Sequence, residues 1–372
     1  MLLKLITIFL FSYSLLAQAI EQDVSPVAQS DLVSHVQNKQ FDAEKDLADA
    51  DMDDLQQDEV LFGVEPQKHI NVASQKAYAD LVSVMPQLAH ASASVNQKDS
   101  NETKEDINSV ILKFASMPRM RSSIVVIYDE NGKQALHSKN ADVVAPIASI
   151  TKLMTAMVVL DANLPLDEKI SISTQDVNKQ KRSRSRTRIG MTLTRGELLK
   201  LALMASDNLS AAALARTYPG GTAAALAQMN AKARELGMDS SHFMDPTGLD
   251  SANVSTANDL VKMVSAAQGY ELIHRFTTST SHTVEVSGRK PLRFHNTNPL
   301  VKNTSWEIGL SKTGYISEAG RCLVMEAKIS EHPVIIVLLD SWGKNSRVAD
   351  AVRVKHWMEN ASVRGARESK NM

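Results

Sequence analysis

The sequence is poor in cysteine and in aromatic residues, and it has one long apolar run. The single cysteine, Cys322, cannot close an internal disulfide or build a thiolate zinc site. The apolar run lies at the N-terminus, and no later stretch is long or apolar enough to cross a bilayer. These features exclude a disulfide-stapled domain and a multi-span membrane protein. With 372 residues, of which 43% are hydrophobic, the chain can still bury a substantial core.

Four common catalytic or binding motifs are also absent. The sequence contains no His-Glu-x-x-His, no Gly-x-Ser-x-Gly, no Gly-x-x-x-x-Gly-Lys and no Gly-x-Gly-x-x-Gly. Their absence argues against a zinc metallopeptidase, an α/β-hydrolase and a nucleotide-binding protein.

Residues 1–19 have the pattern of a secretory signal peptide. Lys4 precedes an apolar run from Leu5 to Leu16, and Ala17 and Ala19 are small residues at the positions that a signal peptidase recognises. The alternative, an uncleaved anchor helix, would need roughly 20 apolar residues. No cysteine follows the small residues, which disfavours a lipoprotein. We therefore expect cleavage after Ala19, export, and a mature protein without a stable membrane anchor.

Charge divides the rest of the chain. Residues 20–110 carry 18 acidic and 6 basic side chains, whereas residues 111–372 carry 24 acidic and 34 basic ones. The clustered charge and the scarcity of aromatic residues predict a disordered acidic arm over residues 20–112. We expect a folded domain over residues 113–362 and a short tail over residues 363–372.

The pattern of the folded domain predicts strands, then helices, then strands and a last helix. A β-branched run over 122–128, an Asn-Gly turn at 131–132 and residues 135–139 predict a hairpin. Helical periodicity follows from residue 149 and over 193–204, 209–218, 222–236 and 256–268. Strands are expected over 282–286, 322–329 and 333–339, and a helix over 347–358. This order predicts an α+β fold: an antiparallel sheet flanked by helices, with an inserted, mainly helical region.

Three short motifs occur in one order: Ser149-x-x-Lys152, Ser206-Asp207-Asn208 and Lys312-Thr313-Gly314. Similar Ser-x-x-Lys sequences begin at Ser287 and Ser341, so each short motif alone is weak. Their settings differ, because Ser149 stands at the predicted start of an amphipathic helix. Residues three apart on a helix are neighbours, which brings Lys152 to the side of Ser149.

These residue types suit acyl transfer through a serine nucleophile. A serine hydroxyl needs an adjacent base, and Lys152 can serve if burial and the second cation, Lys312, keep it neutral. Ser206 can relay a proton to the leaving amine. The predicted catalytic residues are Ser149, Lys152 and Ser206, and the predicted substrate-binding residues are Asn208, Lys312, Thr313, Gly314 and Tyr315. The backbone N–H groups of Ser149 and Tyr315 are the predicted oxyanion hole.

The three motifs resemble those of the serine penicillin-recognising enzymes, the D,D-peptidases and serine β-lactamases. Segments 218–221, 229–232, 245–249, 255–260, 293–298 and 319–324 resemble low-molecular-mass D-alanyl-D-alanine peptidases, most of all the penicillin-binding protein 7 group. The resemblance covers roughly residues 115–360. It implies a β-lactamase/D,D-peptidase-like fold, a periplasmic location in a Gram-negative bacterium, and endopeptidase action on peptidoglycan cross-links.

The resemblance leaves alternatives. A D-alanyl-D-alanine carboxypeptidase would use the same residues, although a larger relative with a C-terminal anchor does not fit the 58 residues after Gly314. A class A β-lactamase needs a Glu-x-x-Leu-Asn segment, which is missing between Ser149 and Lys312. A non-catalytic wall-binding module would not need Lys152. No cofactor or metal is implied, and peptidoglycan and β-lactam antibiotics are the expected ligands. Nucleic acid is not expected, and the sequence identifies no protein partner.

Two features have no place in this mechanism. A basic run over residues 179–188 is either a solvated loop beside the cleft or a docking site for anionic cell-wall polymer. Cys322 is expected to be a buried, small apolar residue rather than a second nucleophile.

Overall fold

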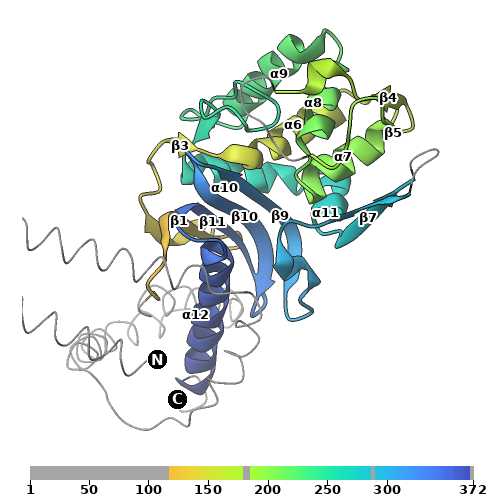
Figure 1. Cartoon of the computed structure of the whole chain (residues 1–372). Helices are drawn as coiled ribbons and strands as arrows, with labels where there is room; N and C mark the ends of the chain where they lie inside the picture. The colour runs from red at the N-terminus through yellow and green to blue at the C-terminus, as the bar shows by residue number, and fades with distance from the viewer. Residues whose placement is uncertain (1–116, 179–184, 286–289, 369–372) are drawn as a thin grey trace, which may run out of the picture. The chain divides into compact units, whose positions relative to one another are not determined.

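The computed structural model describes residues 117–178, 185–285 and 290–368. Their framework is a five-stranded antiparallel sheet in the order β2-β1-β11-β10-β9 (Figure 1). The strands are β1 (Ser122–Asp129), β2 (Gln134–Lys139), β9 (Glu307–Ile316), β10 (Gly320–Ile329) and β11 (His332–Ser341). Val126 in β1 lies opposite Val337 in β11. The last strands therefore pair with the first hairpin, as the sequence predicted.

The sheet buries both of its faces. Alternate residues of β10 point to opposite sides, so Leu323 and Met325 pack with α12 (Ser346–Glu368) on one face. Cys322 and Val324 belong to the larger core on the other face, with α10 (Ala257–Ala267). Cys322 is fully buried, and burial raises the pKa of its thiol to about 11. The prediction that Cys322 is a core residue is confirmed.

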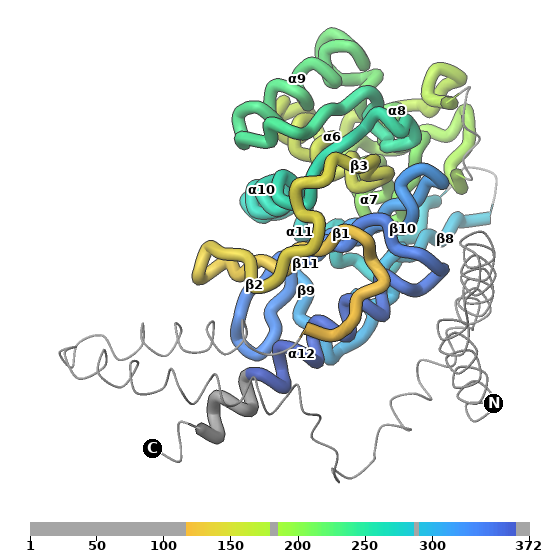
Figure 2. The backbone as a smooth tube through the Cα atoms, turned by 90° about the vertical axis from the view of Figure 1, so that its left-hand side faces the viewer, coloured from red at the N-terminus to blue at the C-terminus, as the bar shows by residue number. Residues whose placement is uncertain are grey.

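The inserted region between β2 and β9 is mainly helical and lies to one side of the sheet (Figure 2). The central helix α6 (Thr151–Asp161) has nine buried residues among its eleven. The other elements are β3 (Ala145–Pro146), η1 (Ala148–Ile150), β4 (Lys169–Ser171), η2 (Thr174–Asp176), β5 (Thr192–Thr194), α7 (Arg195–Met204), α8 (Asn208–Arg216), α9 (Gly221–Glu235), β6 (Val254–Ser255), α11 (Glu271–Thr277), β7 (Ser281–Val284), β8 (Leu292–His295) and η3 (Pro299–Lys302).

The structure differs from the sequence-based predictions at several elements. Strand β9 was not predicted, because Gly309 and Gly314 interrupt its β-branched pattern. Strand β8 and helix α11 were also missed. Helix α12 continues to Glu368, ten residues past the predicted end, since the apolar face of Val354 and Met358 extends to Ala361. The predicted signal peptide, the acidic arm and part of the basic run lie outside the described residues. Within the described ranges, no helix is both long and apolar enough to span a bilayer.

Glu326 in β10 gives the fold a pH dependence. Its carboxylate fills the space beside Gly309, and burial raises its pKa to about 7, with Glu130 and Glu307 adding to the shift. An unfolded chain releases this proton near pH 4.5, so the folded state holds more protons between about pH 4.5 and 7. Stability from this group is therefore lost as the pH rises from about 4.5 through 7. We expect Glu326→Gln to raise the Tm at pH 8 and to change it little at pH 5, measured by calorimetry.

Glu331→Gln is the matched control for this prediction. Glu331 lies in the turn between β10 and β11, and its side chain is 86% exposed beside Lys328. Exposed ion pairs contribute little, so its Tm should stay close to that of the unmodified chain at both pH values. A Glu326→Gln variant that is destabilised equally at pH 5 and pH 8 would contradict the prediction.

Candidate functional site

Ser149 lies in a tight turn that leads into α6. Ala148, the residue before it, has φ of +47°, and its carbonyl oxygen accepts a hydrogen bond of 2.8 Å from Thr151 Oγ1. Non-glycine residues seldom adopt positive φ, so the turn is held in place by its surroundings. Lys152 follows within the first turn of α6, and its Nζ lies 2.7 Å from Ser149 Oγ. The spacing of three residues thus brings the two groups together, as predicted.

Lys152 is 1% exposed and has three hydrogen-bond acceptors. Besides Ser149, its Nζ donates to Asn208 Oδ1 at 2.7 Å and to the Thr247 carbonyl oxygen at 2.5 Å. Burial lowers the pKa of Lys152 to about 7, against the opposing effect of the carboxylates of Asp245 and Asp207. A lysine with this pKa is neutral in a large share of molecules at pH 7. It can then accept the hydroxyl proton of Ser149.

The second motif forms a short connection between α7 and α8. Ser206 has φ of +57°, and Asp207 is the N-cap of α8, accepting from Ser210 N at 2.9 Å. Asp207 also accepts hydrogen bonds from the Thr187 hydroxyl at 2.7 Å and from the Ser185 hydroxyl. This buried carboxylate fixes the loop between two side chains that face the reaction centre, Ser206 and Asn208.

The third motif lies in β9 and reaches the second. Lys312 is 1% exposed, and its Nζ donates to Ser206 Oγ at 2.9 Å and to the Thr313 carbonyl oxygen at 2.8 Å. Burial lowers the pKa of Lys312 well below its usual range, and the charges of Lys152 and Arg347 act in the same direction. Thr313 Oγ1 donates to Thr297 Oγ1 at 2.6 Å. Ser206 therefore stands beside an amine that can exchange a proton with it.

Strand β9 also passes close to the Ser149 backbone. A Cβ placed on Gly314 would lie 3.1 Å from Ser149 N and 3.0 Å from the Ile147 carbonyl oxygen. Glycine at this position leaves the Ser149 amide accessible beside the strand. Tyr315 follows with 56% of its surface exposed, and the Arg321 guanidinium carbon lies 4.5 Å from its ring centre. Ser149 and Tyr315, the two residues of the predicted oxyanion hole, therefore lie on neighbouring segments, the turn before α6 and strand β9.

A fourth segment, residues 245–250, belongs to the site although the sequence motifs did not assign it a role. Asp245 Oδ1 accepts hydrogen bonds from Thr247 N at 2.7 Å and from Gly248 N at 2.5 Å. This turn presents the Thr247 carbonyl to Lys152 and packs Gly248, with φ of +80°, against the peptide between Ala148 and Ser149. Its resemblance to D,D-peptidase sequences was the available indication of its importance.

Taken as chemistry, the arrangement fits acyl transfer by a serine. Neutral Lys152 can take the proton of Ser149 while its oxygen attacks a carbonyl, and the pair Lys312 and Ser206 can return a proton to the leaving amine. Asn208 and the backbone along β9 can hold the substrate. Within the described ranges, no three His, Cys, Asp or Glu side chains gather as a metal site.

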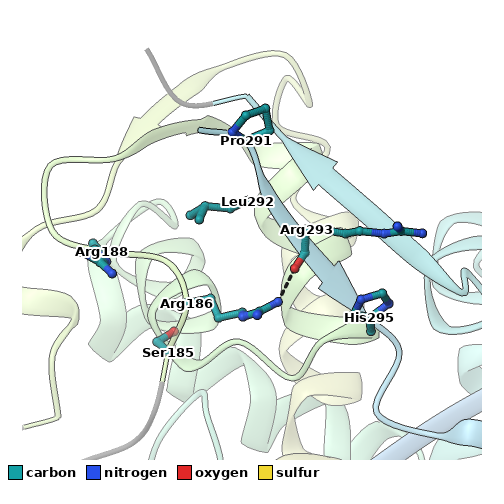
Figure 3. Close-up of a pocket in the computed structure, with 7 residues that line it drawn as sticks. All are labelled: Ser185, Arg186, Arg188, Pro291, Leu292, Arg293 and His295. Atoms are coloured by element: carbon teal, nitrogen blue, oxygen red, sulfur yellow. Dashed lines mark hydrogen bonds between the residues drawn. The ribbon is translucent and has the colours of Figure 1, made fainter. Parts of the chain in front are cut away.

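One cavity lies beside this centre, and a second cavity shares Ser185 and Arg188 with it. The first, of about 360 Å³, includes Asn208 and Thr247, the two residues other than Ser149 that bind Lys152, and has apolar walls at Val177, Ile189 and Leu209. The second, of about 450 Å³, has a basic lining and is shown in Figure 3. Its lining residues are Ser185, Arg186, Arg188, Pro291, Leu292, Arg293 and His295.

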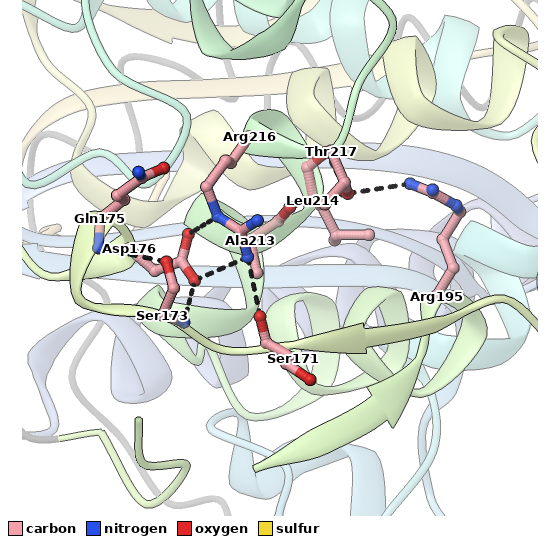
Figure 4. Close-up of polar contacts among 9 residues, drawn as sticks. All are labelled: Ser171, Ser173, Gln175, Asp176, Arg195, Ala213, Leu214, Arg216 and Thr217. Atoms are coloured by element: carbon pink, nitrogen blue, oxygen red, sulfur yellow. Dashed lines mark hydrogen bonds and ion pairs between the residues drawn. The ribbon is translucent and has the colours of Figure 1, made fainter. Parts of the chain in front are cut away.

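An ion pair fixes the outer wall of the first cavity to α8. Arg216, near the end of α8, donates from Nε to Asp176 Oδ1 at 2.7 Å and from Nη2 to the Ser171 carbonyl oxygen at 2.8 Å (Figure 4). Asp176 also accepts a hydrogen bond from Ser173 N at 2.7 Å, and its side chain is fully buried. The helix that begins with Asn208 is thereby tied to the wall that carries Val177.

Comparisons with known proteins agree with this geometry. The family model for D-alanyl-D-alanine carboxypeptidase, Peptidase_S11, matches residues 112–343. The chain belongs to this family. It is accordingly a serine-type D-alanyl-D-alanine peptidase, a hydrolase with the penicillin-recognising fold. The matched residues include the three motifs and end before α12.

Individual relatives of the family extend the likeness. The chain is 46% identical over 247 residues to a D-alanyl-D-alanine endopeptidase of Pseudomonas aeruginosa, covering 66% of this chain and 79% of the relative. It is 45% identical over 250 residues to one of Escherichia coli K12, covering 67% and 81%. Among solved structures, the Streptomyces K15 DD-transpeptidase matches with a TM-score of 0.61 at 28% identity, over 65% of this chain and 98% of that one. The resemblance and the α+β fold class inferred from the sequence are confirmed.

The structure joins five of the eight nominated residues by hydrogen bonds between their side chains, whereas Thr313 binds Thr297 and the Tyr315 ring is exposed beside Arg321. Ser149, Lys152 and Asn208 meet on one side, and Ser206 and Lys312 meet on the other. Thr297, which binds Thr313, and Thr247 are additions that lie far from the motifs in sequence. The individual roles of all these residues stay predictions.

Proposed function

We propose that this chain is a periplasmic D,D-endopeptidase that cleaves the D-alanyl bonds of peptidoglycan cross-links through an acyl-enzyme on Ser149. The observation that carries the chemistry is the 2.7 Å contact between Lys152 Nζ and Ser149 Oγ in a buried setting. The endopeptidase preference is supported by the two relatives at 45–46% identity, both named D-alanyl-D-alanine endopeptidase. Cell-wall remodelling is the biological role that follows from this activity.

In the proposed reaction, Ser149 Oγ attacks the carbonyl of the D-alanine on the amino side of the bond. Its proton passes to Lys152 Nζ, and the negative charge on the carbonyl oxygen is held by the N–H groups of Ser149 and Tyr315. The bond to the leaving nitrogen breaks as Ser206, next to Lys312, supplies a proton. Water then hydrolyses the ester and frees Ser149. A β-lactam, whose amide takes the place of this bond, should form the same ester and leave slowly.

Ser149→Ala should abolish both activities that depend on the ester. Residues 20–372, incubated with cross-linked muropeptide dimers, should yield monomers by mass spectrometry, and a fluorescent penicillin should label the chain. Neither result should appear with Ser149→Ala, because no other hydroxyl lies within 3 Å of Lys152 Nζ among its contacts. Ser317→Ala, a change in an exposed turn bonded to Glu318, is the matched control and should retain both.

The main alternative is a D-alanyl-D-alanine carboxypeptidase, the activity that describes the family model. If monomeric pentapeptides lose one alanine while dimers persist, the endopeptidase proposal is wrong. A wall-binding module would neither cleave nor take the penicillin label, and a β-lactamase would turn the penicillin over rapidly.

The periplasmic location rests on residues 1–19, which resemble a signal peptide. The protein exported from a Gram-negative host should begin at Ile20, as N-terminal sequencing would reveal. A mature chain that retains Met1 would contradict export by cleavage.

A further inference from the structure

The basic run after residue 178 has a described part that the catalytic mechanism does not use. Arg186 and Arg188 lie on this part, between the outer wall of the first cavity and β5. Both side chains are exposed, and both line the 450 Å³ basic cavity. No Asp or Glu is among the residues that line it. A lining with positive charge and without a carboxylate suits a ligand of negative charge.

The cavity is open to the surface and lies between the basic segment and β8. Arg186 reaches across and donates from Nη1 to the carbonyl oxygen of Arg293 (Figure 3). Leu292 points into the space, whereas the Arg293 side chain extends to the far side of β8. The guanidinium of Arg186 has five N–H donors, of which this bond uses one. Arg186 and Arg188 therefore supply the positive charge that faces the cavity, and Arg293 contributes its backbone.

The basic cavity adjoins the first cavity. Ser185 and Arg188 line both cavities, and the first cavity includes Asn208 and Thr247, which bind Lys152. The Ser185 hydroxyl is also bonded to Asp207, the residue after Ser206. One wall of the basic cavity is thus hydrogen-bonded to the segment that holds the predicted proton donor.

The other wall is connected to the third motif. Strand β8 ends at His295, and Thr297, two residues later, accepts the hydrogen bond of Thr313. Lys312, next to Thr313, lies 2.9 Å from Ser206, the residue predicted to give a proton to the leaving amine. Both walls are therefore linked to residues around this predicted proton donor.

We propose that Arg186 and Arg188 bind a carboxylate of the stem peptide that leaves, and so favour a cross-link over a terminal D-alanine. This inference rests on the proposed endopeptidase function. A terminal D-alanine carries one carboxylate, next to the broken bond. The leaving stem of a cross-link is a longer peptide that also ends in a free carboxylate, farther from the bond. The guanidinium groups of Arg186 and Arg188 suit the recognition of this second, more distant carboxylate.

The test compares four substrates on the double variant Arg186→Gln/Arg188→Gln of residues 20–372: soluble cross-linked dimers, penicillin, an amidated dimer and insoluble peptidoglycan. For soluble cross-linked dimers, kcat/KM should fall roughly tenfold, which is the scale of one lost charge-assisted hydrogen bond. The rate of acylation by penicillin, which lacks a leaving stem, should stay within about twofold. A dimer whose terminal carboxylate is amidated should be cleaved roughly tenfold more slowly by the unmodified chain and be unaffected by the variant.

Lys133→Gln/Lys169→Gln is the matched control, because it also removes two exposed positive charges, from the turn before β2 and from β4, and neither lysine lines either of the two cavities. It should leave dimer cleavage unchanged. Equal loss of dimer cleavage and of penicillin acylation in the double variant would overturn the proposal, since the arginines would then support the catalytic centre itself. Unchanged dimer cleavage, with a loss seen on insoluble peptidoglycan alone, would overturn it in favour of docking to the polymer. Failure of the unmodified chain to cleave any dimer, with normal penicillin labelling, would instead refute the endopeptidase function.

Discussion

Replacement of Lys152 by methionine should lower the rate of Ser149 acylation by roughly 10²–10⁴-fold, the usual contribution of a general base. Methionine keeps most of the side-chain volume and removes the amine that lies 2.7 Å from Ser149 Oγ. The rate constant for labelling by a fluorescent penicillin, followed by stopped flow, measures this loss. Lys169→Met, an exposed change on β4, should leave the rate constant unaltered.

The same side chain predicts a pH profile. Burial holds the pKa of Lys152 at about 7, and the neutral amine is the form that accepts a proton. The acylation rate should therefore rise with pH, pass through half of its maximum near pH 7, and level off above it. A rate that is constant between pH 5 and 9, or a Lys152→Met variant that acylates normally, would assign the base to another group.

Burial contributes more to the lowered pKa of Lys152, and so to its neutral form, than the sequence indicated. From the motif alone, the second cation Lys312 and burial were both expected to keep the amine neutral. In the structure, desolvation is the largest cause, and the carboxylates of Asp245 and Asp207 oppose it. Their opposition limits the shift to a value near pH 7, where a base is both available and strong enough to act.

Local sequence was sufficient for the parts of the site that depend on neighbours along one element. The separation of Ser149 and Lys152 is three residues, and helical periodicity located α6, α8 and α10 to within a few residues. The hairpin of β1 and β2 followed from its Asn-Gly turn in the same manner.

Contacts between distant segments were outside the reach of such patterns. The Thr247 carbonyl oxygen accepts a hydrogen bond from Lys152, which lies 95 positions away in the sequence. Thr313, which donates to Thr297, lies on β9, a strand that was not predicted. Glycines at 309 and 314 hide β9 because they weaken the strand pattern, yet Gly309 gives room to Glu326 and Gly314 to the Ser149 turn. Both glycines let atoms from other segments approach the strand, and the residue pattern of a sequence does not show which atoms approach.

The second large effect is expected from a substitution of Gly248. This residue has no side chain, and its backbone packs directly against the Ala148–Ser149 peptide. A Cβ at position 248 would lie 2.8 Å from Ser149 N and closer still to the Ala148 carbonyl oxygen, where real Cβ atoms are not found. The backbone also has φ of +80°, a conformation that costs an L-residue about 1–2 kcal/mol. We expect Gly248→Ala to displace the turn that carries the nucleophile and to slow acylation roughly 10²-fold, the scale for a misplacement of about 1 Å.

A substitution of Gly237 separates the two expected effects of Gly248→Ala, backbone strain and steric contact with the Ser149 turn. It also has positive φ, +68°, but a Cβ there would meet no atom within 4 Å. Gly237→Ala should therefore lose stability through its backbone alone and retain the acylation rate per folded molecule. Gly248→Ala should lose a further 1–3 kcal/mol of unfolding free energy through overpacking, measured in urea, and lose its acylation rate as well. If both variants acylate alike, contact with the Gly248 backbone does not position Ser149, and the role of residues 245–250 is confined to the carbonyl that Thr247 presents to Lys152.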